Sequence, residues 1–399
     1  MINNFKGGNP LLALEGVKVL DLTMVIPGQF CTMLLADMGA EVIKVERYIP
    51  EEFIPKPILD RLRATRRLDR NKKSIGLNLK SKEGLQLFHK LAKGADVIFE
   101  GYRPQVTKGM GIDYDTIKEM NTRIVYCSLS GFGQDGPYVN LPGFDLSYIA
   151  TAGVLDVIQD KNGFPVIPSN FIGDIAGGGS LAALGITMAL LARERTGKGQ
   201  YIDIGIADGA VAIMSQAFAM HWFDRENSIT SDTVHIEKQA DYGVYETKGG
   251  GYVSIAAIIP QFWTSLCKAV GHEELIFDQG NVEKRQEIRK VLEEVFRTKT
   301  RDEWFDILTQ CDVPVAKVND LDEAAECPQY IHRKMIVEME NPVSKKREKH
   351  VGIPIKLSDT PGSLRTYPPS TGQHTDEILR NMGLSASEIS KLRETKVIH

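Results

Sequence analysis

The sequence predicts an α/β protein with a large, Rossmann-like domain built on a parallel sheet and a smaller α+β domain. Three observations support this prediction. Apolar runs of strand length alternate with amphipathic stretches of helix length from Val17 to Gly131. Beyond Arg225 the pattern changes to a hairpin followed by a helix. A chain of 399 residues, of which 42% are hydrophobic, is also long enough to form more than one core.

The alternation begins with one complete strand, helix and strand. The run VKVLDLT predicts a strand, Pro27 and Gly28 interrupt it, QFCTMLLADMGA predicts a helix, and EVIKVE predicts the second strand. The same order continues through KSIGLNL, KEGLQLFHKLAKGA, DVIFEGY, DYDTIKEMN and RIVYCSLSG. Such alternation predicts a mostly parallel sheet with helices on both faces.

A long uncharged segment, Ile175–Ala192, follows these repeats. Its eighteen residues are the minimum for a membrane span. Several glycines dilute its hydrophobicity, however, and the chain has no second candidate, so we expect a helix buried in a globular core and no membrane association. The run YIDIGIA then predicts another strand, and a helix is expected from Asp208 to about Phe223.

The second domain is expected after a polar linker, Arg225–Asp241. The stretch YGVYETKGGGYVSIAAI predicts a hairpin that turns at three glycines, and VEKRQEIRKVLEEVFR has apolar residues at helical spacing. Past Pro342 the chain is rich in Lys, Arg and Pro, and we expect it to return to the first domain. The expected divisions are residues 1–222 for the first part of the large domain, 223–335 for the linker and small domain, and 336–399 for the return.

Composition excludes several classes of function. A net charge of -4 argues against a nucleic-acid-binding protein. The five cysteines have no CxxC spacing and the eight histidines form no ligand motif, so we expect neither a metal site nor a catalytic thiol. The N-terminal MINNFKGG lacks the apolar stretch of a secretory signal, which predicts a cytoplasmic protein.

One carboxylate, Asp174, comes just before three consecutive glycines in GDIAGGGS. The ordinary explanation is a helix cap, worth about 0.5–2 kcal/mol. Three glycines at a helix start cost about 1 kcal/mol each relative to alanine, which capping alone does not require. They suggest close approach of a ligand to backbone N–H groups, and those of Gly177 and Gly178 are candidates for an oxyanion site. The spacing matches no known nucleotide-binding loop.

Several stretches together resemble the class III CoA-transferases and the 2-methylacyl-CoA racemases that share their fold. They are LEGVKVLDLTMVIPGQFCTMLLADMGAEVIKVER, NKKSIGLNLKSKEG, FEGYRPQV, LSGFGQDGPY, the block from GDIAGGGS to RERTGKGQYIDIGIADG, VPVAKVNDLDEA and GQHTDEIL. The resemblance covers nearly the whole chain.

The resemblance implies that Asp174 is a nucleophile. In formyl-CoA transferase and its relatives this aspartate attacks the thioester of the donor and forms a mixed anhydride, which CoA converts to an aspartyl-CoA thioester. The incoming acid then takes CoA by the reverse sequence. A helix N-terminus would keep such a carboxylate ionised. The implied substrates are an acyl-CoA, with succinyl-CoA a candidate donor, and a carboxylic acid, with no tightly bound cofactor.

The racemases instead pair this aspartate with a histidine and a glutamate that move a proton. Here Phe144 stands where the histidine would be, and Ile259 stands where the glutamate would be. Neither side chain carries a proton, so the sequence favours CoA transfer. A racemase, a non-catalytic CoA-ester-binding subunit and a simple CoA-ester-binding protein remain the alternatives.

The resemblance also supplies binding residues and an assembly. The residues implied to bind CoA are Arg47, Leu77, Lys80, Tyr102 and Arg103, and those implied to line the acyl pocket are Ile26, Phe144, Tyr148 and Ile259. The basic stretch RLRATRRLDRNKKS is either a solvated surface or a support for the 3′-phosphate of CoA. An interlocked dimer is implied, either a homodimer or a heterodimer with a related chain.

Overall fold

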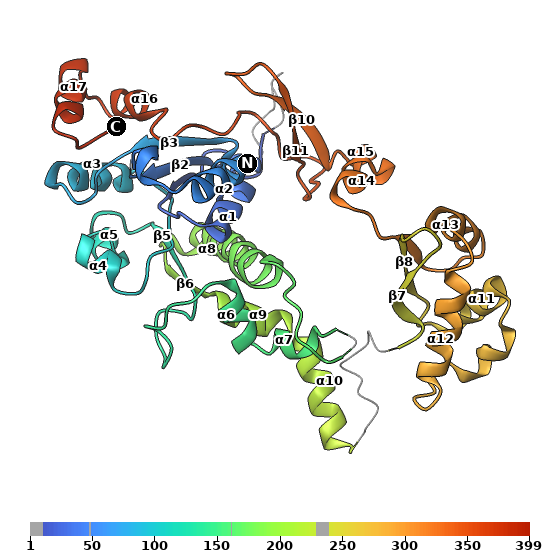
Figure 1. Ribbon diagram of the computed structural model, residues 1–399. Coiled ribbons are helices and arrows are strands. Elements are labelled where there is room, and N and C mark those ends of the chain that lie inside the picture. The colour runs from blue at the N-terminus through green and yellow to red at the C-terminus, as the bar shows by residue number, and fades with distance from the viewer. Residues whose placement is uncertain (1–10, 48, 161, 229–238) are drawn as a thin grey trace. The chain divides into compact units, whose positions relative to one another are not determined.

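The computed structural model describes residues 11–47, 49–160, 162–228 and 239–399 (Figure 1). The chain forms two compact units. The large unit runs to Met214 and resumes at His332, and the small unit is Ser215–Ile331. These boundaries lie close to the expected ones after residues 222 and 335. Most of the linker expected at Arg225–Asp241 lies outside the described residues.

A six-stranded parallel sheet forms the centre of the large unit. Its strands lie in the order β3-β2-β1-β4-β5-β6, which is the Rossmann order, and the expected fold class is confirmed. Leu20 of β1 pairs with Ile43 of β2 on one side and Ile98 of β4 on the other. All six strands are parallel, and the order in which successive strands are added along the sheet reverses between β1 and β4. The strands are β1 (Lys18–Asp21), β2 (Glu41–Glu46), β3 (Lys72–Gly76), β4 (Val97–Glu100), β5 (Val125–Ser130) and β6 (Tyr201–Gly205).

Successive side chains along each strand point to opposite faces of the sheet, and an apolar core forms on each face. Val97 and Phe99 face one core, whereas Ile98 between them faces the other. The helices of this unit in the first 160 residues are α1 (Ile26–Asp37), α2 (Lys56–Thr65), α3 (Lys82–Lys93), α4 (Val106–Met110), α5 (Tyr114–Met120), α6 (Asp145–Thr151) and α7 (Val154–Val157). Short 3-10 turns, η1 (Glu51–Phe53) and η2 (Arg66–Asp69), flank α2, and α9 (Ile206–Ile213) follows β6.

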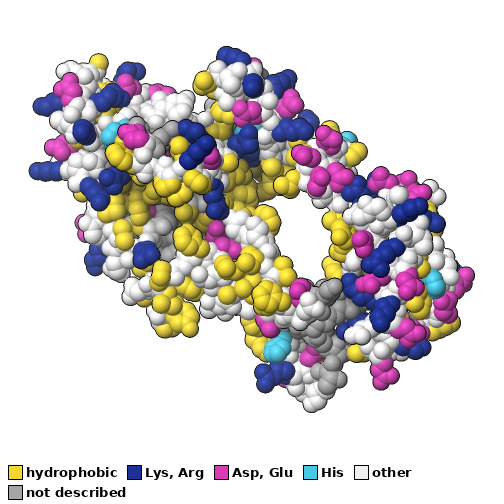
Figure 2. All heavy atoms as spheres, in the orientation of Figure 1, with side chains coloured by type: hydrophobic (Ala, Val, Ile, Leu, Met, Phe, Trp, Pro, Cys, Tyr) yellow, Lys and Arg dark blue, Asp and Glu magenta, His cyan; other side chains and the backbone are white. Residues whose placement is uncertain are grey.

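The long apolar segment differs from the expected buried helix. It begins as a π-helix, η3 (Phe171–Ser180), and continues as α8 (Leu181–Thr196). Leu184, Met188 and Leu191 of α8 are about half exposed, because the helix covers the sheet with only one of its faces. Figure 2 shows apolar side chains over the part of the large unit where α8 lies. The combined helix is long and apolar enough to cross a membrane, but 44% of its most apolar window is buried.

The last part of the chain returns to the large unit (Figure 1). The hairpin of β10 (Ile336–Glu340) and β11 (Arg347–Val351) is followed by α16 (Thr375–Asn381) and α17 (Ala386–Glu394). Ile398 forms an antiparallel bridge with Leu77, just beyond β3. The final residues therefore complete the sheet edge and the core beneath it.

The small unit has its own sheet and core. The predicted hairpin is confirmed, and a third strand joins it in the order β7-β8-β9. Trp263, Phe296 and Trp304 are buried at its centre. The predicted helix from Asp208 is broken at Met214, so that α10 belongs to this unit. The elements are α10 (Ser215–Glu226), β7 (Tyr242–Glu246), β8 (Tyr252–Ala256), α11 (Pro260–Val270), η5 (Glu273–Asp278), α12 (Arg285–Phe296), α13 (Arg301–Gln310), β9 (Val315–Lys317), α14 (Leu321–Glu326) and α15 (Pro328–His332).

Close packing of η3 against α9 generates a stability prediction. A Cβ atom at Gly209 would lie 2.0 Å from the carbonyl oxygen of Gly177, so Gly209→Ala must separate the two helices. We expect the free energy of unfolding, measured in urea, to fall by about 1–3 kcal/mol. The matched control is Gly185→Ala in α8, whose Cβ would lie 3.4 Å from Ile202, an ordinary contact. Equal effects of the two substitutions would contradict the packing argument.

Candidate active site

A cleft opens at the carboxyl ends of β1, β4 and β5 in the large unit. This is the point where the order of the strands reverses, and open α/β sheets bind ligands there. Its described walls come from the segments that follow these strands and from α6, η3 and α9. The lining residues are Thr23, Val25, Pro27, Gly101, Tyr102, Arg103, Pro104, Leu129, Ser130, Gly131, Phe132, Gly133, Val139, Leu141, Pro142, Gly143, Phe144, Tyr148, Asp174 and Ile206.

Asp174 reaches this cleft from the first half of η3. Its backbone N–H donates to Oδ1 of Asp145 at 2.8 Å, which links η3 to the first turn of α6. The side-chain amide of Asn170 donates to Oδ2 of Asp174 at 3.5 Å. Among the described residues, the carboxylate of Asp174 accepts no hydrogen bond from a backbone N–H. The structure therefore gives no support to the interpretation of Asp174 as a helix cap.

The environment of Asp174 makes its carboxylate a stronger base than a solvated one. Burial raises its pKa to about 6, and the negative charge of Asp145 acts in the same direction. The Asn170 amide and the charge of Arg61 oppose these effects. A pKa near 6 leaves the carboxylate mostly ionised at neutral pH. Asp174 lies in the first turn of η3 rather than ahead of the helix, so the helix dipole still favours the anion.

The glycines after Asp174 allow three helices to pack closely. A Cβ atom on Gly177 would lie 2.8 Å from the backbone nitrogen of Ala210 in α9, and one on Gly179 would lie 2.5 Å from the carbonyl oxygen of Pro27 in α1. Gly177 and Gly178 are buried and are not among the residues that line the cleft. Helix packing thus accounts for the glycines, and an oxyanion site at Gly177 and Gly178 stays a prediction.

Aromatic side chains form part of the cleft wall. The hydroxyl of Tyr148 donates to the carbonyl oxygen of Gly143 at 2.6 Å, and its ring meets that of Phe132 edge to face at 5.2 Å. Burial, followed by the charge of Asp174, raises the pKa of Tyr148. Phe144 is 82% exposed and lies at the N-cap of α6. The cleft therefore presents apolar surface beside the carboxylate.

The other two residues predicted for the acyl pocket lie elsewhere. Ile26 is half-buried between Val25 and Pro27, which line the cleft, but it does not line the cleft itself. Ile259 belongs to the small unit, where it is the N-cap residue of α11. The place of both residues in an acyl pocket stays a prediction.

The residues predicted to bind CoA fall into two groups. Tyr102 and Arg103 line the cleft, and within the described chain the guanidinium of Arg103 has no hydrogen-bond or ion-pair partner. Arg47, Leu77 and Lys80 follow β2 and β3 at the same edge of the sheet but do not line the cleft. The side chain of Leu77 is buried in the core, so only its backbone could contact a ligand.

The basic stretch that leads into β3 divides into an exposed part, with Arg61, Arg63 and Arg67, and a buried part, with Arg70 and Lys72. Arg70 is 2% exposed and pairs with Asp37 at 2.6 Å, and Lys72 is 1% exposed and pairs with Asp69 at 2.8 Å. Burial alone would raise the pKa of Asp69, but the ammonium groups of Lys72 and Lys44 lower it to about 2. Neither a solvated surface nor a phosphate site describes Arg70 and Lys72. Their charges are already compensated.

This buried network also fixes one wall of the cleft, where two lining residues, Thr23 and Ser130, were not predicted from the sequence. Oδ1 of Asp21 accepts hydrogen bonds from both the backbone N–H and the hydroxyl of Thr23, and Lys72 lies 3.6 Å from Oδ2 of Asp21. Thr23 and Ser130 line the cleft directly after β1 and at the end of β5. The parallel arrangement of these strands was the signal that could have identified both residues.

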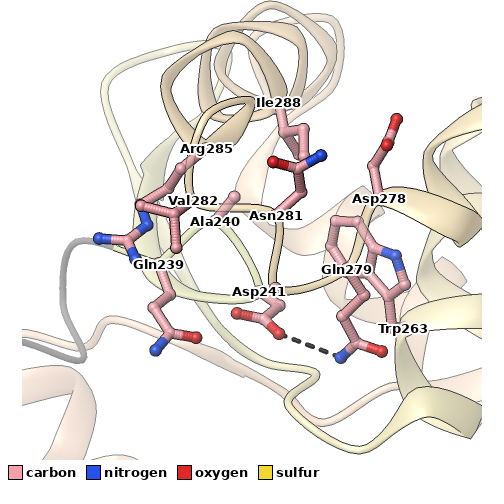
Figure 3. Close-up of a pocket in the computed structure, with 11 residues that line it drawn as sticks. Gln239, Ala240, Asp241, Trp263, Asp278, Gln279, Asn281, Val282, Arg285 and Ile288 are labelled. Atoms are coloured by element: carbon pink, nitrogen blue, oxygen red, sulfur yellow. Dashed lines mark hydrogen bonds between the residues drawn. The ribbon is translucent and has the colours of Figure 1, made fainter. Parts of the chain in front are cut away.

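The small unit has a separate hollow beside α11 and α12 (Figure 3). The side chains of Asp241 and Gln279 point toward each other there, and Nε2 of Gln279 donates to Oδ2 of Asp241 at 3.0 Å (Figure 3). None of the predicted site residues lines this hollow. In the part of the chain that the structure describes, no three His, Cys, Asp or Glu side chains are grouped to hold a metal ion.

Comparison with known proteins gives the family. The family model described as CoA-transferase family III matches residues 14–375. The chain belongs to CoA-transferase family III. Two human relatives of this family III protein are alpha-methylacyl-CoA racemase, 32% identical over 97% of this chain and 98% of the relative, and succinyl-CoA:glutarate CoA-transferase, 33% identical over 94% and 87%. The family resemblance found in the sequence is therefore confirmed.

A solved structure agrees with this assignment. The crystal structure of a CAIB/BAIF family protein from Brucella suis matches with a TM-score of 0.78 and 26% identity, over 93% of this chain and all of that one. The family III chain is accordingly an enzyme of the CoA-transferase group, and CoA thioesters are the substrates that its family uses.

The raised pKa of Asp174 predicts how this residue affects stability. Its pKa in the folded protein, about 6, lies above the value of 3.8 for an unperturbed carboxyl. Ionisation therefore costs stability increasingly as the pH rises from about 4 to 6, and the full cost is present above 6. We expect Asp174→Asn to raise the melting temperature by about 1–2 °C at pH 8 and to leave it unchanged at pH 4. Asp156→Asn, at an exposed acid, should show no such difference, and a lower melting temperature for Asp174→Asn at pH 8 would contradict the prediction.

Proposed function

We propose that the protein transfers CoA from an acyl-CoA donor to a carboxylic acid, with Asp174 as the covalent nucleophile. The observation that carries the proposal is that Asp174 is the one carboxylate among the described residues that line the cleft. Succinyl-CoA is the proposed donor, because one relative is named for succinyl-CoA. A cytoplasmic location, a dimeric assembly and the absence of a tightly bound cofactor belong to the same proposal.

The reaction would proceed by four nucleophilic substitutions, each at an acyl carbonyl carbon. The Asp174 carboxylate attacks the thioester of the donor, and the C–S bond breaks to give a mixed anhydride and CoA thiolate. The thiolate attacks the aspartyl carbonyl, releases the donor acid and leaves an aspartyl-CoA thioester. The acceptor carboxylate attacks this thioester, and the C–S bond breaks to give a second anhydride with Asp174 and free CoA thiolate. The thiolate then attacks the acceptor acyl group and restores the free aspartate.

The surroundings of Asp174 suit this role. A partly desolvated carboxylate with a pKa of about 6 is a better nucleophile than a solvated one, and it is still mostly ionised at neutral pH. The guanidinium of Arg103 in the same cleft is available to an anionic group of CoA or of the acid. Apolar wall residues such as Phe132 and Leu141 would limit the access of water to the anhydride.

A racemase is the second candidate because one relative at 32% identity is named as a racemase. Proton exchange needs an acid or base on each face of the reacting carbon. Phe144 lines the cleft near the N-terminus of α6 and carries no proton. Asp145, the next residue, is buried and already accepts the N–H of Asp174. This arrangement favours transfer.

Trapping the covalent intermediate tests the proposal. Incubation with succinyl-CoA and no acceptor, followed by hydroxylamine or borohydride, should change the mass of the peptide that spans Pro168 to Arg193. Asp174→Asn and Asp174→Ala should lose the label and reduce CoA transfer by about a thousandfold or more, because neither side chain can form the anhydride.

Two results would contradict this mechanism. One is an Asp174→Asn variant that transfers CoA at a rate near that of the wild type. The other is rapid deuterium incorporation beside the thioester of a 2-methylacyl-CoA in deuterated water without any labelled peptide, which would establish the racemase instead.

Arg103→Ala tests where CoA binds. Loss of a charge-assisted hydrogen bond is worth about 1.5–3 kcal/mol, so we expect the KM for the acyl-CoA to rise about tenfold or more while kcat changes little. Arg123→Ala is the control, since Arg123 pairs with Glu194 near the opposite, amino end of β5. An unchanged KM for Arg103→Ala would remove this residue from the CoA site.

A further inference from the structure

A buried carboxylate lies directly beneath the cleft loop that carries Arg103. Glu100 is the last residue of β4 and is 2% exposed. One of its oxygens, Oε2, accepts the backbone N–H of Tyr102 at 2.7 Å. The other accepts the hydroxyl of Ser128 from the neighbouring strand β5. Both oxygens are therefore engaged, one by the sheet and one by the loop.

Glu100 has no compensating positive charge among the described residues. Burial raises its pKa to about 7, although the hydrogen bonds from Ser128 and Tyr102 act against this, and the charge of Asp203 in β6 raises it further. A buried carboxylate without a cation costs stability. By contrast, Asp69 in the same unit is buried between Lys44 and Lys72. If the side chain of Glu100 only filled space in the core, an apolar residue of similar size would serve without this cost.

The loop Gly101–Pro104 depends on this contact at its beginning. All four of its residues line the cleft. At the end of the loop, the N–H of Val106 donates to the carbonyl oxygen of Arg103 at 3.2 Å, and Gln105 has a left-handed φ of 70°. No described side-chain contact holds the guanidinium of Arg103. Its position is therefore set by the backbone of the loop, which Glu100 fixes through Tyr102.

We propose that Glu100 is a positioning residue whose carboxylate holds the loop Gly101–Pro104 in the conformation that presents Arg103 to CoA. The proposal rests on the proposed function, which places CoA in this cleft. Glu100 itself would touch neither CoA nor the reacting atoms. It would act on the affinity for CoA and leave the chemistry at Asp174 unchanged.

Two substitutions of similar size separate this role from a structural one. Glu100→Gln can still accept the N–H of Tyr102 through Oε1 and can donate to Ser128 through Nε2. Glu100→Met fills the same space but accepts neither bond. We expect Glu100→Met to weaken the binding of CoA, measured by isothermal titration calorimetry, by about tenfold or more, because small displacements of a binding group are costly. Glu100→Gln should bind CoA within about twofold of the wild type.

Two further measurements complete the test. Ser128→Ala removes only the bond on the sheet side and should leave CoA affinity within about twofold. At saturating succinyl-CoA, Glu100→Met should label Asp174 to the same extent as the wild type, so a loss confined to binding is distinguished from a loss of chemistry.

Three outcomes would overturn the proposal. The first is a folded Glu100→Met protein that binds CoA as tightly as the wild type. The second is a Glu100→Gln protein that binds as weakly as Glu100→Met, which would assign the effect to charge. The third is the failure of Glu100→Met and Glu100→Ala to fold, which would assign Glu100 to the stability of the sheet. If the wild-type protein itself failed to bind CoA or to become labelled, the proposed function would be refuted instead.

Discussion

The site depends on how closely η3 can approach its neighbours. Gly177 and Gly179 let its backbone lie against α9 on one side and α1 on the other, at distances that any side chain would prevent. This approach brings Asp174 to the carboxyl end of the parallel sheet, beside the loops that follow β1 and β4. The close approach of the η3 backbone to its neighbours thus determines where the carboxylate of Asp174 lies.

Acidic residues in the large unit behave differently because their neighbours differ. Asp69 lies between two ammonium groups and its pKa falls to about 2. Asp174 and Glu100 are also removed from water but have no such partner, and burial raises their pKa values to about 6 and about 7. The first stabilises the framework, whereas the other two are held at a cost to stability near the cleft. Strongly perturbed carboxyl groups in a cleft are typical of functional sites.

The sheet could be predicted from the sequence because its signal is local. Alternation along β4 and β5, together with the short amphipathic helices between strands, defines both faces before any long-range contact is known. The π-helix could not be predicted in this way, since its conformation follows from packing against α1 and α9. Arg70 and Lys72 were misleading for a related reason. Arg70 pairs with Asp37, which lies far from it in the sequence, and although Asp69 is only three residues from Lys72, the sequence does not show that this pair is buried.

The pairing of Ile398 with Leu77 affects the order in which the protein can form during synthesis. The small unit is contiguous, so it can fold once Ile331 has left the ribosome. The large unit cannot close its sheet edge at β3 until the residues around Ile398 have been translated. Until then, the apolar surface that α16 and α17 will cover is open to solvent or to a chaperone. A nascent chain of this protein would therefore carry a folded small unit before the large unit, whose two parts flank it in the sequence, is complete.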